Sequence, residues 1–562
     1  MKRFFGLGIV LILLYAILLT AIPTSAVSAG PYNSSDSCIK SIKINTTKKL
    51  ANGKANYYQA TVNSSEHGNN KNYRNHAMHV AIGSKNTKFF VYSAESADKM
   101  GYAKKSVYDI VTAFEKENPD WQVVAAVNGD FFNKNSGEPE DPMIQNYQML
   151  KSYMLPDYAA RGRGLVGTSE VTGKAVYFTL GSAYTNAKYG IPYTFDGNYQ
   201  VQILDSNKLA PTDSYRSSLG IAPSASTISF TTSDYGQGAY AGKTVYVVKL
   251  SRYRRDRGQK NDSGDQKTYY FAEGTITGTV TGTNGMKPKK GEAYIAVASA
   301  SQAPLLKVGA VVRCQKQLAG EWKNVSNAIG FKQQILAEGN LMFKNAYSRY
   351  HTGDGANKGE TEKWTEDIYD YPHFWKARTA IGFKADGTPV FLTAQYTKPN
   401  VSATYYELSC QFKALGCTNA FLLDCGGSST MVIREGNSLK TVHHAENGND
   451  GEGRSIANIA IMAVLKDGKT SKFPTKNMNI GSTVVTEKKT TAKKTQKNDQ
   501  NEIVEEELID TMLDTELVSE SETEMEQKSG CGGSLAFPAI LATGGIAVAG
   551  FGKKRSDRKK KK

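Results

Sequence analysis

The sequence predicts an α/β fold of the mixed α+β kind, with mixed β-sheets, flanking helices and a site at the strand ends. Two stretches, residues 106–132 and 404–430, support this prediction because each reads as a helix, a strand and then a polar segment. The residues between them contain many short β-like runs. Alternating helices and strands are typical of α/β proteins, whose ligands usually bind at strand ends.

The earlier stretch opens at Ser106, which forms a capping-box pattern with Asp109. Apolar residues then recur at helical spacing, and Asn118-Pro119 stops the helix. Residues 123–127 are apolar and predict a buried strand. That strand would deliver the segment 128–132, Asn-Gly-Asp-Phe-Phe, to the end of a sheet.

The later stretch repeats this plan. Thr404 and Glu407 form another capping-box pattern, and Gly416 suits the end of the helix. We therefore expect Glu407 to cap the helix rather than to act as an acid. The apolar residues 420–423 predict a buried strand that delivers the polar segment 424–430.

Between these stretches the sequence predicts β structure. Residues 379–383 and 389–393 flank Asp386-Gly387, a combination that predicts a hairpin. Residues 252–265 are polar and charged, so we expect an exposed loop there. Four further runs read as short strands: 244–250, 268–272, 275–280 and 293–299.

Both ends of the chain carry membrane-directed signals. Residues 1–29 hold two basic residues, an apolar run and then small residues, which indicates a secretory signal peptide; an uncleaved anchor is the alternative. The apolar residues 535–552 predict a C-terminal transmembrane or sorting segment, and the basic residues 553–562 a cytoplasmic tail. The body, residues 30–481, would then lie outside the cell, held to the bacterial membrane by this anchor.

Residues 482–534 join the body to the anchor and change from a basic, Thr-rich run to an acidic one. Such a composition buries too little apolar surface to fold, so we expect a disordered charged stalk. Its Cys531 is either a processing site or a spacer residue.

The chain has a formal net charge of +16 and six cysteines. A basic exported body suggests anionic neighbours such as cell-wall polymers or phosphodiesters, although a lysine-rich solvated surface would give the same charge. We expect no nucleic-acid partner and no cofactor. Six cysteines are too few for a disulfide scaffold of this length, and without a CxxC pair we expect no zinc site built from cysteines.

Four segments, in their order and wide spacing, resemble the phosphodiester glycosidase family, whose bacterial relatives are often described as exopolysaccharide-related proteins. They are residues 128–132, 378–382 (Arg-Thr-Ala-Ile-Gly), 424–430 (Asp-Cys-Gly-Gly-Ser-Ser-Thr) and 454–458 (Arg-Ser-Ile-Ala-Asn). A weaker segment, 291–340, is similar to the family's middle portion. The resemblance covers roughly residues 38–466. Cys425 departs from the pattern because the family usually has a glycine there, and a position needing positive φ would make cysteine costly.

The resemblance and the residue types together give a candidate site. Asp424 and Asp130 are the candidate catalytic carboxylates, although each could instead stabilise its own turn. Arginines, hydroxyls and backbone amides suit a phosphate, although each arginine could instead form a structural salt bridge. The candidate substrate-binding residues are Asn128, Gly129, Arg378, Gly426, Gly427, Ser428, Ser429 and Arg454.

The histidines give a weaker signal. His443-His444 could form a metal or acid–base pair, but adjacent histidines in a loop rarely face one site. We expect His76 and His79 at the surface. Whether any metal takes part is left open by the sequence.

The resemblance implies hydrolysis of sugar-1-phosphodiesters at the anomeric carbon, in cell-surface or extracellular glycans. A phosphate ester leaves as a stable anion, so arginines and amide donors could matter as much as two carboxylates. Asp424 or Asp130 would activate water or stabilise an oxocarbenium-like transition state. Two alternatives stay open: a metal-dependent phosphodiesterase, and a non-catalytic surface protein that binds cell-wall polymers.

Overall fold

The computed structural model describes residues 27–34, 38–65, 73–152, 163–179, 199–204, 211–219, 223–224, 227–234, 238–260, 266–342, 377–395, 403–445 and 453–470. All of them belong to one compact unit, Met1–Glu487. The predicted stalk, anchor and tail, and the predicted signal peptide up to residue 26, lie outside these residues. Within them, no helix has the length and apolar character needed to cross a membrane.

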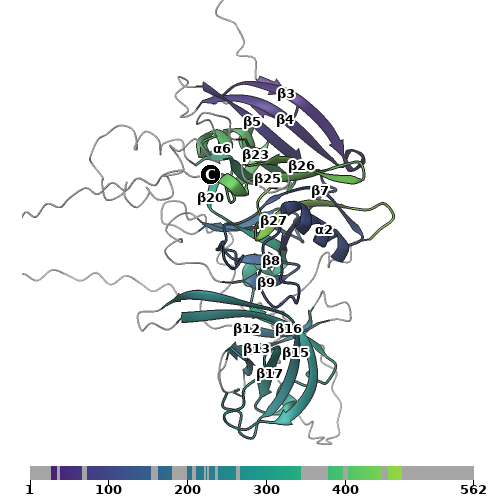
Figure 1. Cartoon of the computed structure of the whole chain (residues 1–562), viewed down its shortest axis with the longest axis vertical. Coiled ribbons are helices and arrows are strands. Elements are labelled where there is room, and N and C mark those ends of the chain that lie inside the picture. Colours follow the sequence, from purple (N-terminus) through teal and green to yellow (C-terminus); the bar gives the residue numbers. More distant parts are fainter. Residues whose placement is uncertain are drawn as a thin grey trace, which may run out of the picture. The chain divides into compact units, whose positions relative to one another are not determined.

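The fold is mostly β, so the predicted α/β class is wrong (Figure 1). The described residues contain two α-helices, α2 (Val107–Glu117) and α6 (Tyr405–Ala414). Both predicted helix–strand units do form. However, the strands that follow the helices, β7 (Trp121–Asn128) and β24 (Cys417–Leu422), pair antiparallel with all their neighbours. Hairpins and long excursions of the chain, rather than crossover helices, therefore connect the sheets.

The largest sheet has eight strands in the order β21-β20-β24-β22-β23-β5-β4-β3. Helix α6 covers one of its faces, where Leu408 and Phe412 share a buried core with Val80 and Leu392. The strands not yet bounded are β3 (Ile39–Leu50), β4 (Ala55–Ser65), β5 (Tyr73–Ile82), β20 (Gln333–Ala337), β21 (Asn340–Leu341), β22 (Arg378–Lys384) and β23 (Pro389–Ala394).

A five-stranded sheet of order β26-β25-β7-β27-β6 packs against the other face of the large sheet. Phe391 and Phe421 of the large sheet share one buried core with Val127 and Met431 of this one. Helix α2 covers the far face through Phe114, whose ring lies 5.1 Å from that of Phe90. The new strands are β6 (Lys88–Ser93), β25 (Thr430–Glu435), β26 (Ser438–His444) and β27 (Asn458–Leu465).

A second five-stranded sheet, of order β11-β10-β19-β8-β9, adds Ile329 and Phe331 to the same core. Its strands are β8 (Met143–Gln145), β9 (Gln148–Lys151), β10 (Gly164–Ser169), β11 (Ala175–Thr179) and β19 (Val325–Phe331). A two-stranded sheet pairs β1 (Val27–Ala29) with β2 (Tyr32–Ser34).

A closed barrel is inserted in the chain between β11 and β19 and has a core of its own, which includes Val201, Phe230 and Ile295. Its strand order is β12-β13-β14-β17-β15-β16-β18, and β13–β14 is the parallel pair among the described strands. The bounds are β12 (Tyr199–Leu204), β13 (Pro211–Leu219), β14 (Ile228–Thr232), β15 (Thr244–Lys260), β16 (Gln266–Thr281), β17 (Glu292–Val297) and β18 (Val311–Lys316).

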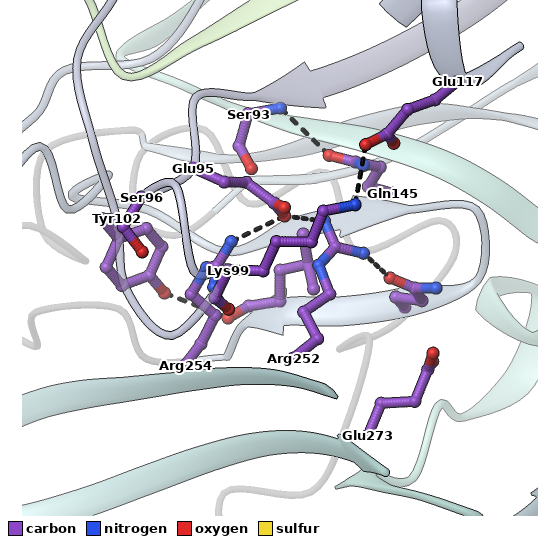
Figure 2. A network of polar contacts seen from close by, with 12 residues as sticks. Ser93, Glu95, Ser96, Lys99, Tyr102, Glu117, Gln145, Arg252, Arg254 and Glu273 are labelled. Carbon is purple, nitrogen blue, oxygen red and sulfur yellow. Dashed lines mark hydrogen bonds and ion pairs between the residues drawn. The ribbon is translucent and has the colours of Figure 1, made fainter. Parts of the chain in front are cut away.

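The predicted exposed loop at 252–265 is wrong for residues 252–260, which continue strand β15. Arg252 and Arg254 both form ion pairs with Glu95 (Figure 2), and Arg254 Nη2 lies 2.6 Å from Glu95 Oε1. Asp256 accepts hydrogen bonds from the Tyr102 hydroxyl (2.6 Å) and the Ser152 amide (2.9 Å). Charged side chains can be buried in a strand when they are paired in this way.

Other local predictions have mixed outcomes. The Ser106 and Thr404 caps and the hairpin around Gly387 are confirmed. His76 and His79 are buried rather than exposed, because β5 lies inside the large sheet. His76 Nε2 lies 2.8 Å from Glu407 Oε1, so Glu407 caps α6 and also holds a buried histidine. A disulfide between Cys38 and Cys410 links the residue just before β3 to α6.

Candidate active site

The segments after β7 and β24 lie side by side, and Asn128 joins them. Its Nδ2 donates to the main-chain oxygen of Asp424 (2.8 Å), and its Oδ1 accepts from the Thr379 hydroxyl (2.7 Å) and the Thr430 amide (3.0 Å). The Asp424 amide in turn donates to the Gly129 carbonyl (2.9 Å). Asn128 is fully buried, so these bonds fix three of the four family-like segments together.

The fourth segment joins through Asn458 at the start of β27. Its Oδ1 accepts from the Asp130 amide, and its main-chain oxygen accepts from the Gly129 amide, both at 2.8 Å. A Cβ at Gly129 would lie 2.1 Å from Asn458 Oδ1, so this position admits only glycine without movement. The motifs are thus brought together by backbone bonds and buried asparagine side chains.

Asp424 keeps a small exposure, 8%, at the end of its strand. Its Oδ1 accepts from the Cys425 amide (2.8 Å), and its carboxylate is hydrogen-bonded to the Ser428 side chain. Burial raises the pKa of Asp424 to about 6, while these bonds and the positive charges of Arg454 and Lys332 oppose the rise. The carboxylate can therefore change protonation state near neutral pH. It partly caps its own turn, as the structural alternative expected.

Cys425 causes no backbone strain. Its φ is −117°, an extended value open to any residue, and the positive φ of this turn, +67°, falls on Gly426. Gly427 is needed for another reason, because a Cβ there would lie 2.3 Å from Arg454 Nη2. The turn therefore brings the Arg454 guanidinium close to its backbone, next to Asp424.

Asp130 is buried more deeply than Asp424, with a relative exposure of 2%. Its Oδ2 accepts from the Asp141 amide (2.8 Å), and the Asp141 carboxylate is 3.1 Å from Arg163 Nη1. Gly330 leaves room for this carboxyl group, since a Cβ there would lie 2.7 Å from Asp130 Oδ2. Burial, followed by the negative charge of Asp141, raises the pKa of Asp130 well above its ordinary value.

The remaining predicted residues differ in their access to a ligand. Arg378 is 1% exposed, donates from Nε to the Ala403 carbonyl (3.3 Å) and stacks on the Tyr405 ring, whereas Arg454 is half-buried. The Ser429 amide donates to the Gly426 carbonyl (3.0 Å), so it is used within the turn. Arg454 is thus better placed than Arg378 or the Ser429 amide to meet an anion.

The histidine pair does not form a site. His443 is buried and its ring stacks on His79 at 5.1 Å, while His444 is exposed. In the described part of the chain, no group of three or more His, Cys, Asp or Glu side chains is arranged to hold a metal ion.

Three residues at the site were not found by sequence reasoning: Lys332, Asp141 and Arg163. The Lys332 ammonium lies 5.1 Å from the Phe131 ring centroid, and the Arg163 guanidinium lies 5.3 Å from it. Each comes from a segment without a polar strand-end motif. The acidic run at 138–141 was the available signal for Asp141.

Comparison with known proteins supports the resemblance read from the four segments. Residues 266–463, less than half of the chain, match the family model described as phosphodiester glycosidase. Three of the four segments lie inside this range, and the segment 128–132 lies before it. The resemblance to phosphodiester glycosidases is therefore confirmed.

Matches to individual proteins are either short or low in sequence identity. The SPbeta prophage-derived uncharacterized protein YomE of Bacillus subtilis (strain 168) is 34% identical over 97 residues, which cover 17% of this chain and 14% of that protein. A hypothetical protein from Synechocystis has a TM-score of 0.38 at 15% identity, covering 75% of this chain and 64% of that one. The catalytic domain of zebrafish N-acetylglucosamine-1-phosphodiester alpha-N-acetylglucosaminidase, auto-inhibited by its pro-peptide, has a TM-score of 0.31 at 12% identity, covering 77% and 96%.

Proposed function

We propose that the chain is an exported, membrane-anchored hydrolase that cleaves the glycosidic bond of sugar-1-phosphodiesters in cell-surface or extracellular glycans. One observation carries the proposal: Asp424, with a pKa raised to about 6, stands beside the cations Arg454 and Lys332 at the junction of the family-like segments. A glycosyl centre needs a carboxylate, and a phosphodiester needs positive charge. The Asp424 turn supplies the carboxylate, and Arg454 and Lys332, from two other segments, supply the positive charge.

The chemistry assigned to each group follows from its environment. Asp424, ionised above pH ~6, would accept a proton from water or stabilise positive charge at the anomeric carbon. Arg454 and Lys332 would bind the phosphate, which leaves as a monoester anion. The Ser428 side chain and the Cys425 amide keep Asp424 oriented. Asp130 is proposed as the second carboxyl group, and Arg378 as a buried cation behind the turn.

The disulfide supports the exported part of the proposal. Cys38 and Cys410 are 372 residues apart in sequence and are joined by a disulfide. Such bonds persist in oxidising compartments outside the cytoplasm. Membrane anchoring rests on the predicted apolar segment 535–552, and the basic composition supports an anionic glycan as partner.

The test is to identify the bond that breaks. The purified protein is incubated with glycosyl-1-phosphodiesters in ¹⁸O-labelled water, and the products are analysed by mass spectrometry. We expect label on the sugar and none on the released phosphate monoester. Label on the phosphate, in a reaction stopped by a chelator and restored by divalent ions, would instead identify a phosphodiesterase. Binding of anionic glycan without any product would identify a binding protein.

A further inference from the structure

Asp130 and Asp141 form a close pair of buried carboxyl groups. Asp141 is fully buried and Asp130 is 2% exposed. The Asp141 amide donates to Asp130 Oδ2 (2.8 Å), and the two side chains are hydrogen-bonded to each other. A hydrogen bond between two carboxyl groups needs a proton on one of them, because ionised carboxylates only accept.

The charges around the two carboxyl groups also favour a proton on one of them. Arg163 is the guanidinium that contacts the pair, and it is shared with Glu140, whose Oε2 lies 2.8 Å from Nη2. Lys151 also faces Asp141, but its ammonium is bound to Glu138 and lies near Asp256. Three carboxyl groups thus surround one guanidinium, so a proton on the pair removes an uncompensated buried charge.

We propose that Asp130 and Asp141 share one proton at neutral pH, so that Asp130 serves as a proton donor while Asp424 is ionised. Asp141 is then a positioning residue that acts through Asp130. Asp130 Oδ1 is buried and has no hydrogen-bond partner among the described residues, and it is the oxygen that we assign to proton donation. Burial raises the pKa of both carboxyl groups, which agrees with the shared proton.

The donor role rests on the proposed function, and the reaction balances. The bond from C1 to the phosphate oxygen breaks, and a bond from C1 to the water oxygen forms. Asp424 takes a proton from water, and the Asp130–Asp141 pair gives one to the phosphate monoester. Exchange with solvent then returns both groups to their starting states.

The shared proton can be measured without any substrate. The full chain is labelled with ¹³C at the aspartate carboxyl carbons, and the side-chain signals are followed by NMR between pH 5 and 9. We expect one protonated aspartate signal at neutral pH that disappears in Asp130→Asn and Asp141→Asn. Asp256→Asn is the matched control, since Asp256 is equally buried but accepts bonds from Tyr102 and Ser152; it should leave the signal in place.

If a variant fails to fold, the NMR spectrum of the wild-type protein still tests the proposal. A spectrum in which every aspartate is ionised at pH 7 would overturn it. In the folded Asp141→Asn variant, the alkaline limb of the pH–kcat/KM profile should move down by about one pH unit or more. A protonated pair in an inactive protein would leave the shared proton standing and refute the proposed hydrolase instead. An unmoved limb in an active Asp141→Asn variant would refute the positioning role.

Discussion

Asp424 and Asp130 follow two strands of facing sheets, and a buried asparagine bonds to the main chain of each, Asn128 to Asp424 and Asn458 to Asp130, yet their surroundings differ. Asp424 keeps some exposure, accepts a bond from the Cys425 amide and has two cations nearby. Asp130 is buried deeper and faces a second carboxyl group. Two carboxyl groups that both follow a strand are thereby driven toward different protonation states. Such a separation is how one site obtains both a base and an acid.

The largest effect is expected from Asp424→Asn. Removing the proposed base should lower kcat about 10³-fold. Because burial raises the pKa of Asp424, its ionised form opposes folding above pH ~6, so the variant should melt at the same or a higher temperature than wild type at pH 7. Steady-state kinetics and calorimetry measure the two effects. The exposed Asp467→Asn is the control, and full activity in Asp424→Asn would end the assignment.

Asn128→Ala should loosen the contact between the strand end that carries Asp130 and the segments that carry Asp424 and Thr379. The change removes a donor to Asp424 and an acceptor for Thr379 and Thr430, all buried. We expect a loss of about 3 kcal/mol in the free energy of unfolding, since buried polar partners are left unsatisfied. Denaturant titration measures it. A loss below about 0.5 kcal/mol would show that Asn128 does not join the segments.

Arg454→Ala should weaken substrate binding on the Asp424 side. Losing a charge-assisted contact with phosphate should raise KM about tenfold, whereas Arg454→Lys should recover only part of this because a lysine offers no planar fork. The comparison of KM across the three proteins tests the role. A wild-type KM in Arg454→Ala would assign phosphate binding to Lys332 or Arg378 instead.

The smallest effect is expected from Cys425→Gly. Because the φ of Cys425 is −117°, glycine offers no conformational relief here; its greater freedom in the unfolded chain and the loss of the buried thiol, which donates to the Leu423 carbonyl, should together cost about 1–2 kcal/mol. Activity should change less than about threefold. A large gain in activity would mean that the cysteine side chain obstructs the site, in contrast to the geometry of this turn.

Local structure could be predicted from the sequence where the signal is local. The caps at Ser106 and Thr404 and the hairpin at Gly387 depend on residues three or four apart, and all formed. The fold class could not be predicted. The sequence shows that a strand follows each helix, but it does not show which other strands pair with that strand. The polar residues 252–260 look like a loop in the sequence, because the ion pairs of Arg252 and Arg254 with the distant Glu95 cannot be seen there.

The candidate site shows the same limit. The motif residues Asp424, Asn128 and Arg454 were named from sequence and lie together in the structure, and Asp130 is tied to the motif residue Asn458. Three further residues reach the site from segments that carry no motif. Lys332 follows β19, Asp141 precedes β8 and Arg163 precedes β10. These three residues act on the site through their charges, and the strength of that effect depends on burial. The periodicity of the sequence does not predict this burial.

The most direct test of the account is the pH dependence of kcat/KM on a glycosyl-1-phosphodiester. A bell-shaped profile is expected, with an acid limb near pH 6 from Asp424 and an alkaline limb at higher pH from the Asp130–Asp141 pair. Activity should fall as pH drops below 6, because Asp424 gains a proton. An acid limb near the ordinary carboxyl pKa of ~4, or a profile flat from pH 5 to 8, would contradict the separation of the two carboxyl groups.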